Sequence, residues 1–227
     1  MKKHPILNYS KLLLFGIIIA HLHACAPSRL VKPLAKNEQA IGATLGGPLM
    51  LYGGGAIPTP LTSVFYAKGL TDKTSAFASL HTTSLLFGVF QTDIGICHTL
   101  LNSEDNKTGL SVNPALNFAV DRWEWNTRIW PQLDVNIHHE TPEGHLYYAG
   151  LCNWFETNPT KPHEQTQSQY WIYCPQIGVQ FKKGQWNFGI ESKWIAPTNK
   201  NQPTVVDYIG IQHQGAIGAY FQIMRRF

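Results

Sequence analysis

Residues 186–196, WNFGIESKWIA, decide the fold because their side chains alternate in polarity along the whole stretch. One set of alternate positions is largely apolar and includes Trp186 and Trp194, whereas the other set carries Asn187, Glu191 and Lys193. Successive side chains of a β-strand point to opposite faces, so this alternation predicts a strand with one apolar and one polar face.

The same alternation recurs on both sides of this stretch, in runs of about ten residues separated by Gly, Asn, Asp or Pro, which is typical of an antiparallel all-β protein. From Ala40 onward no helical periodicity and no apolar run long enough for a transmembrane helix is present. We predict ten strands, with eight or twelve as the alternatives, near residues 40–48, 61–69, 75–87, 89–100, 110–120, 125–139, 145–156, 170–182, 186–197 and 210–227.

Alternation alone does not tell which face meets water, because a soluble sandwich would bury the apolar face. Three features favour lipid on that face instead. Aromatic residues flank aliphatic strand centres, the polar face is poor in Lys and Glu, and short turns mostly alternate with long loops. Charged residues make up 14% of the chain, against about 25% in soluble domains. An up-and-down transmembrane β-barrel is therefore predicted, with a soluble β-sandwich or lipocalin-like domain as the alternative.

Two stretches resemble small bacterial outer-membrane barrels by motif. Gly69-Leu70-Thr71-Asp72 looks like their periplasmic turn, in which Gly69 would adopt a conformation that other residues resist while Thr71 and Asp72 bind the turn backbone. The alternating apolar residues that end at Phe227 resemble the C-terminal signal for outer-membrane insertion, although Arg225 departs from it. The resemblance implies the lipid bilayer and the barrel-assembly machinery as partners.

The beginning of the chain resembles a lipoprotein signal. A basic start and the apolar run 12–20 precede Leu22-His23-Ala24-Cys25, which is similar to a lipobox. This resemblance implies a signal peptide over residues 1–24, cleavage before Cys25 and lipid, such as palmitate, on that cysteine; an ordinary signal peptide with Cys25 nearby is the alternative. Ala26 implies the outer membrane.

The remaining domain boundaries follow from composition. Residues 25–39 contain prolines and polar residues without periodicity and are predicted to be the lipidated N-terminus and a linker, and residues 40–227 form the barrel. Both termini are expected in the periplasm. Lys2, Lys3 and Lys11 belong to the signal, so the mature chain is nearly neutral and a nucleic-acid partner is not predicted.

Cys152 and Cys174 lie symmetrically about the middle of the predicted loop 157–169, so simple hairpin register would place them opposite each other. A disulfide between them is one interpretation, and packing as two small apolar side chains is the other. Cys97 has no evident partner.

No catalytic, cofactor or metal site is predicted. His138, His139 and His145 bracket one turn, but His138 and His139 would point to opposite faces of a strand. His81, His98 and His213 accompany common Ser and Asp residues without a nucleophile-elbow motif.

Four charged residues on polar strand faces are interpreted as ion pairs that fill the lumen. They are Arg128, Asp134, Glu191 and Lys193.

These features together predict a lipid-anchored outer-membrane β-barrel with a structural or interaction role, with or without a narrow pore. An outer-membrane enzyme that acts on lipid or peptide at the barrel mouth is the alternative from another class. The sequence names no substrate.

Overall fold

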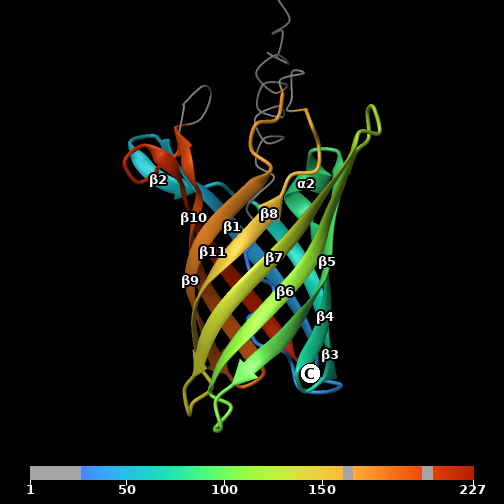
Figure 1. The fold of residues 1–227 in the computed structure, drawn as a ribbon, viewed down its shortest axis with the longest axis vertical. Helices are drawn as coiled ribbons and strands as arrows, with labels where there is room; N and C mark the ends of the chain where they lie inside the picture. Colours follow the sequence, from blue (N-terminus) through green and yellow to red (C-terminus); the bar gives the residue numbers. More distant parts are fainter. Residues whose placement is uncertain (1–26, 161–165, 201–206) are drawn as a thin grey trace, which may run out of the picture.

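The computed structural model describes residues 27–160, 166–200 and 207–227. The predicted signal peptide and Cys25 lie outside the described residues. In the described part the chain forms an antiparallel barrel of ten strands, tilted around a common axis (Figure 1). The barrel strands are β1 (Gln39–Tyr52), β3 (Thr62–Thr71), β4 (Thr74–His81), β5 (Val89–Asn102), β6 (Thr108–Asp121), β7 (Thr127–Glu140), β8 (Leu146–Phe155), β9 (Trp171–Lys183), β10 (Trp186–Lys200) and β11 (Gln214–Arg226).

Pairing of the first and last strands closes the barrel. β11 runs antiparallel to β1 in a register that extends from Ala40 opposite Arg226 to Pro48 opposite Gly218. All remaining pairs of neighbouring barrel strands are consecutive along the chain. The predicted all-β, up-and-down, ten-stranded barrel is thereby confirmed.

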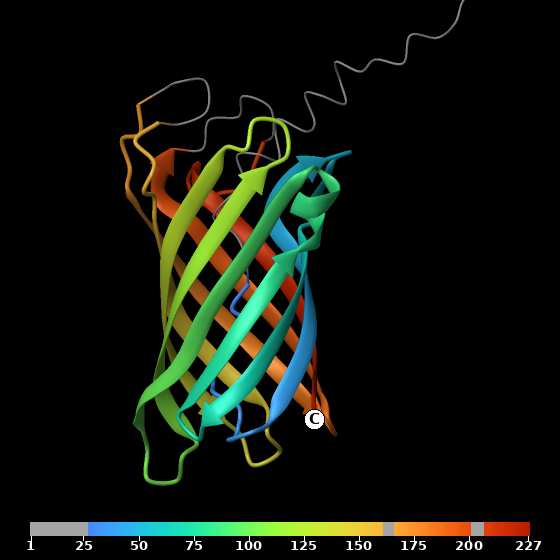
Figure 2. The same ribbon diagram turned by 90° about the vertical axis from the view of Figure 1, so that its right-hand side faces the viewer.

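The two ends of the barrel differ. The C-terminus and the short turns lie at one end, here called the turn end, and the longer connections lie at the other end, the mouth (Figure 2). At the mouth β1 continues beyond the barrel and pairs with β2 (Gly55–Pro58). Short turns therefore mostly alternate with longer loops, as predicted, although the β5–β6 and β7–β8 turns are as long as the β6–β7 connection at the mouth.

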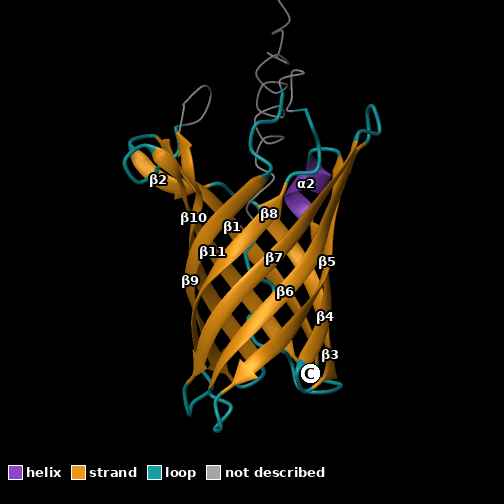
Figure 3. Cartoon of the chain, viewed as in Figure 1, coloured by secondary structure: helices purple, strands orange, loops and turns teal. Residues whose placement is uncertain are grey.

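The connection after β4 differs from the prediction, which continued that strand to residue 87. Residues Thr82–Leu86 form the short helix α2, shown at the mouth in Figure 3. Gly88, at φ +76°, links this helix to β5. No helix in the described part of the chain is long and apolar enough to cross a membrane.

The two faces of the strands have the predicted assignment. On β9 and β10 the exposed side chains include Ile177, Phe188 and Ile190, while Glu191 and Lys193 are buried. A soluble barrel would show the opposite arrangement, with polar groups outside and apolar groups inside. The outer surface is thus an apolar band and the inner surface is largely polar.

The Gly69 prediction is wrong in its mechanism. Gly69 lies within β3, its φ is not positive, and the turn consists of Asp72 and Lys73. Thr71 Oγ1 accepts a hydrogen bond from Lys73 N at 3.2 Å, as expected. The Asp72 carboxylate instead accepts one from Lys36 N at 3.2 Å, so it binds the N-terminal segment.

Candidate functional site in the barrel lumen

Residues Pro27–Lys36, here called the lumenal segment, occupy the inside of the barrel (Figure 2). The sequence predicted an irregular linker here, and the segment indeed contains no helix or strand. What the sequence did not indicate is its position. Its groups form hydrogen bonds with strands all around the barrel, through Thr44, Ser63, Ser75, Ser79, Asp93, Ser111, Asn113, Asp134, Glu191 and Gln222.

Arg29 is the centre of a buried polar cluster. Its Nη2 atom lies 2.8 Å from Asp93 Oδ2, and both side chains are almost fully buried. His81 Nε2 lies 2.9 Å from the same carboxylate oxygen. The guanidinium also donates to Ser63 Oγ at 2.7 Å and Ser79 Oγ at 3.1 Å. A planar guanidinium with five donors suits this arrangement, because partners on four strands, including Thr44 on β1, can be satisfied at once.

A second charged cluster holds Ser28. The backbone N–H of Ser28 donates to Glu191 Oε1 at 3.2 Å, and Tyr148 donates to Glu191 Oε2 at 2.8 Å. Lys193 Nζ lies 3.4 Å from Glu191 Oε1, and the lysine is 1% exposed. Ser28 Oγ reaches Asp134 at 3.5 Å. Asp134 of β7 and Glu191 of β10 therefore both accept hydrogen bonds from Ser28 of the lumenal segment.

Three of the four predicted lumenal charges, Asp134, Glu191 and Lys193, do gather in the lumen. Arg128 does not join them, because its guanidinium donates to Thr160 O at 3.5 Å near the mouth. The cationic partner that sequence reasoning missed is Arg29, which lies in a stretch without periodicity. The buried Asp93 on β5 was the available signal, since an acidic side chain at an inward position requires a partner.

On the turn-end side of the charged clusters, the lumenal segment packs against apolar side chains. Leu30 and Leu34 join a buried cluster with Phe65, Phe77 and Met224. The Leu30 and Val31 carbonyls accept hydrogen bonds from Asn113 and Ser111, at 2.5 and 2.6 Å. Satisfied backbone groups and buried leucines together fix the segment in the lumen.

Gly69 lets the segment leave the lumen at the turn end. Gly69 N donates to Glu38 O at 2.8 Å, and Gly69 O accepts from Asn37 N at 2.9 Å. A Cβ at residue 69 would collide with the Ala35 carbonyl oxygen. The glycine is therefore required by close approach of the backbone.

Gly69→Val is expected to lower the free energy of unfolding by about 1–3 kcal/mol, because the added side chain displaces the chain at Ala35. Urea unfolding in detergent measures the change. Gly55→Val is the matched control for added size, since a Cβ there meets no atom closer than 3.8 Å and the residue does not have a positive φ. A Gly69 variant as stable as the native chain would contradict this role.

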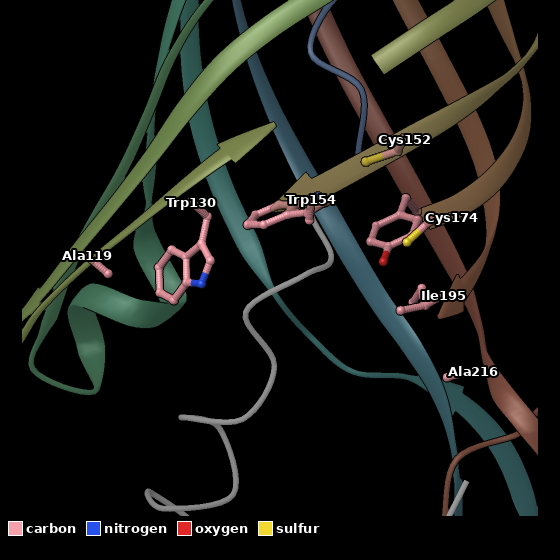
Figure 4. Close-up of a cluster of buried hydrophobic side chains, with 8 residues drawn as sticks. Ala119, Trp130, Cys152, Trp154, Cys174, Ile195 and Ala216 are labelled. Carbon is pink, nitrogen blue, oxygen red and sulfur yellow. The ribbon is translucent and has the colours of Figure 1, made fainter. Parts of the chain in front are cut away.

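The mouth half of the lumen has a different lining. A buried apolar cluster, here called the inner apolar lining, is formed by side chains from the mouth-side parts of the strands (Figure 4). Its members are Ala119, Trp130, Cys152, Trp154, Cys174, Ile195, Ala216 and Tyr220. The Trp130 and Trp154 ring centroids are 6.4 Å apart. The lumen wall is therefore apolar in the mouth half on the side of β6–β11, whereas the Arg29 cluster lies against β1, β3, β4 and β5.

Cys152 and Cys174 stand directly opposite each other on β8 and β9, which is the register that the sequence predicted. In the structure both are free thiols, and Cys97 is also free and buried. The disulfide itself stays a prediction.

The histidines considered as metal ligands or catalysts take separate positions. His138 is buried, His139 Nδ1 is 2.8 Å from Thr108 Oγ1, and His145 Nδ1 accepts from Lys182 N at 3.2 Å. His98 Nδ1 contacts Thr74 Oγ1 at 2.8 Å, whereas His81 contacts Asp93. Within the described ranges, no group of three or more metal-ligating side chains was found.

Comparison with family models found no match, and comparison with curated proteins found none. Two solved structures are similar in fold. The translocator domain of autotransporter NalP from Neisseria meningitidis is 11% identical, with 96% of this chain and 95% of that chain covered and a TM-score of 0.44. Outer membrane protein OprG from Pseudomonas aeruginosa is 11% identical, with 87% and 99% covered and a TM-score of 0.33.

Proposed function

We propose that this protein is an outer-membrane β-barrel with a structural or interaction role, anchored by lipid on Cys25 and closed by its own lumenal segment. The observation that carries the proposal is the seating of Arg29 between Asp93, Ser63 and Ser79. A barrel of ten strands is only slightly wider than the eight-stranded barrels whose interiors side chains alone can fill. A segment of backbone inside it leaves little room for solutes.

The membrane assignment is supported by the apolar outer face, and the orientation by the C-terminal strand. Phe221, Ile223 and Phe227 are exposed on the outer face near the turn end. Arg225 extends over the Trp186 ring, with 5.7 Å between its guanidinium carbon and the ring centroid. A long cationic side chain stacked on an interfacial aromatic ring suits a headgroup region. We place the C-terminus in the periplasm and the barrel-assembly machinery as the insertion partner.

The interaction role is supported by aromatic side chains at the mouth. Tyr52, Trp123 and Trp125 are among the most exposed large side chains of the described residues. They lie on the β1–β2 hairpin and the β6–β7 connection. Exposed aromatic residues are enriched at sites of protein association. We propose that this rim contacts other envelope molecules outside the cell.

Single-channel recording in a planar lipid bilayer tests the closure. The native chain is expected to show no resolved conductance steps, and a variant that lacks residues 27–36 is expected to show discrete steps. Removal of Arg29 leaves Asp93, Asp134 and Glu191 facing the lumen against Lys193, so the open variant should prefer cations. Adding Asp93→Asn to the deletion should reduce that preference.

Heat-modifiable migration on a gel shows that each variant is folded before it is recorded. A folded deletion variant that stays silent, or a native chain that conducts as well as the variant, would contradict closure by the lumenal segment.

Lipid attachment is checked separately by the mass of the N-terminal peptide, which should carry diacylglycerol and acyl groups at Cys25.

A further inference from the structure

We infer that the barrel binds an anionic phospholipid at the turn end, with the phosphate held between Lys183 and Arg225 and the acyl chains along the outer faces of β9, β10 and β11. This inference rests on the proposed membrane assignment. It adds a preference for one class of lipid headgroup, and it places the site on one side of the barrel, close to the C-terminus (Figure 1).

The first step is the register of three neighbouring strands. Trp186, the first residue of β10, lies opposite Lys183 on β9 and opposite Arg225 on β11, and all three are exposed. Residues directly opposite each other share a face of the sheet, so the two cations flank the indole with about 10 Å between their Cα atoms. Long side chains that approach from both sides can meet at one phosphate.

The second step is the unused binding capacity of these cations. Arg225 lies over the Trp186 ring at 5.7 Å, and its Nη2 donates to Gln185 Oε1 at 3.4 Å, which uses one of its five donors. The Lys183 ammonium forms no hydrogen bond or ion pair with the described residues. A guanidinium fork binds two oxygens of a phosphate at once, and an ammonium adds a point charge beside them.

The third step is the charge around the site. The five neighbouring strands β9, β10, β11, β1 and β3 contain one acidic residue, Glu191, and it is buried in the lumen. Glu38, which precedes β1, pairs with Arg226 at 3.9 Å. The ammonium of a zwitterionic headgroup would therefore meet Lys183 and Arg225 with no strand carboxylate to receive it. A headgroup whose only charge is the phosphate avoids this repulsion.

The fourth step is the surface for the acyl chains. In the next row towards the mouth, Phe188 lies opposite Phe181 and Ile223, and all three are exposed on the outer face. Two residues along a strand span about 6.6–6.8 Å. Hydrocarbon therefore begins on this apolar row when the phosphate lies between Lys183 and Arg225. The departure of Arg225 from the apolar C-terminal pattern then has a reason, because this residue contacts a headgroup.

Native mass spectrometry of the full chain in a non-ionic detergent tests the inference. The protein is titrated with dipalmitoyl phosphatidylglycerol, which is anionic, and with dipalmitoyl phosphatidylethanolamine, which has the same chains and a zwitterionic headgroup. The first phosphatidylglycerol should bind at least about fivefold more tightly than the first phosphatidylethanolamine. Arg225→Gln and Lys183→Gln should each lower the phosphatidylglycerol affinity by about fivefold and leave the phosphatidylethanolamine affinity unchanged.

Lys68→Gln is the matched control. Lys68 is also exposed towards the turn end, but the residues opposite it on β1 and β4 are Gln39 and Ala76, so neither neighbouring strand places a second cation beside it. Because the first lipid occupies the site with two cations, the loss of Lys68 should leave its affinity unchanged. Heat-modifiable migration confirms that each variant is folded.

The outcomes are distinct. Equal affinities for the two lipids, or equal losses in Lys68→Gln and Lys183→Gln, overturn this inference and leave the membrane assignment intact. Displacement of the lipid by glycerol phosphate, which has no acyl chains, also overturns it, because the ligand would then be a soluble phosphate. A chain that stays folded without detergent and retains neither lipid overturns both this inference and the proposed membrane assignment.

Discussion

Arg29→Ala is expected to lower the free energy of unfolding by about 3–5 kcal/mol, the usual cost of removing one partner of a buried ion pair. The guanidinium is held by Asp93 at 2.8 Å and by hydroxyls of Ser63 and Ser79. Alanine leaves the buried carboxylate with His81 at 2.9 Å but without its cation. Urea unfolding of the purified protein in detergent, followed by tryptophan fluorescence, measures the change.

Lys32→Ala is the matched control for this substitution. Lys32 belongs to the same lumenal segment and pairs with Glu140 of β7, but both side chains are 30% exposed. An ion pair that water reaches contributes less than about 1 kcal/mol. If Arg29→Ala costs no more than Lys32→Ala, the Arg29 cluster does not hold the segment in the lumen.

A double substitution, Arg29→Met with Asp93→Leu, separates charge from packing. Replacing a buried ion pair by apolar residues of similar volume is often neutral. The double variant should therefore recover most of the stability that Arg29→Ala loses, and its segment should remain seated by Leu30 and Leu34. A double variant less stable than Arg29→Ala would contradict the buried charge on Asp93 as the cause of the loss.

Ile177→Arg is expected to destabilise the barrel by about 2–4 kcal/mol in phospholipid vesicles, the cost of a cation on the lipid face near the bilayer midplane. Ile177 lies at the centre of β9, on the outer face, and is 64% exposed. In water the same substitution at an exposed site would change stability by no more than about 0.5 kcal/mol. Urea unfolding from vesicles provides the measurement.

Tyr52→Arg supplies the comparison, because Tyr52 is 72% exposed on the β1–β2 hairpin beyond the barrel. Its cost should stay within about 0.5 kcal/mol. Equal small costs at both positions would mean that the outer face of β9 meets water, and the lipocalin-like alternative would then hold.

The sequence by itself determined the strands and their faces. A period of two is a local property of the backbone, so Ile190 and Glu191 could be assigned to opposite faces from neighbouring residues alone. The choice of Ile190 for the outside needed the aromatic flanks, the polar face poor in Lys and Glu, and the alternating loop lengths of the whole chain. The opposition of Cys152 and Cys174 followed in the same way from a hairpin with simple register. The helix α2 was missed because five residues are too few to show a helical period.

Only the tertiary structure decided what fills the barrel. Arg29 and Asp93 are 64 positions apart, and the lumenal segment has neither a helical nor a strand period that would indicate its surroundings. Its partners come from strands distributed around the whole barrel, and they face one another only after β11 pairs with β1. Gly69 illustrates the same limit: its sequence context indicated a turn, but the reason for glycine is the carbonyl of Ala35, which closure of the barrel brings against it.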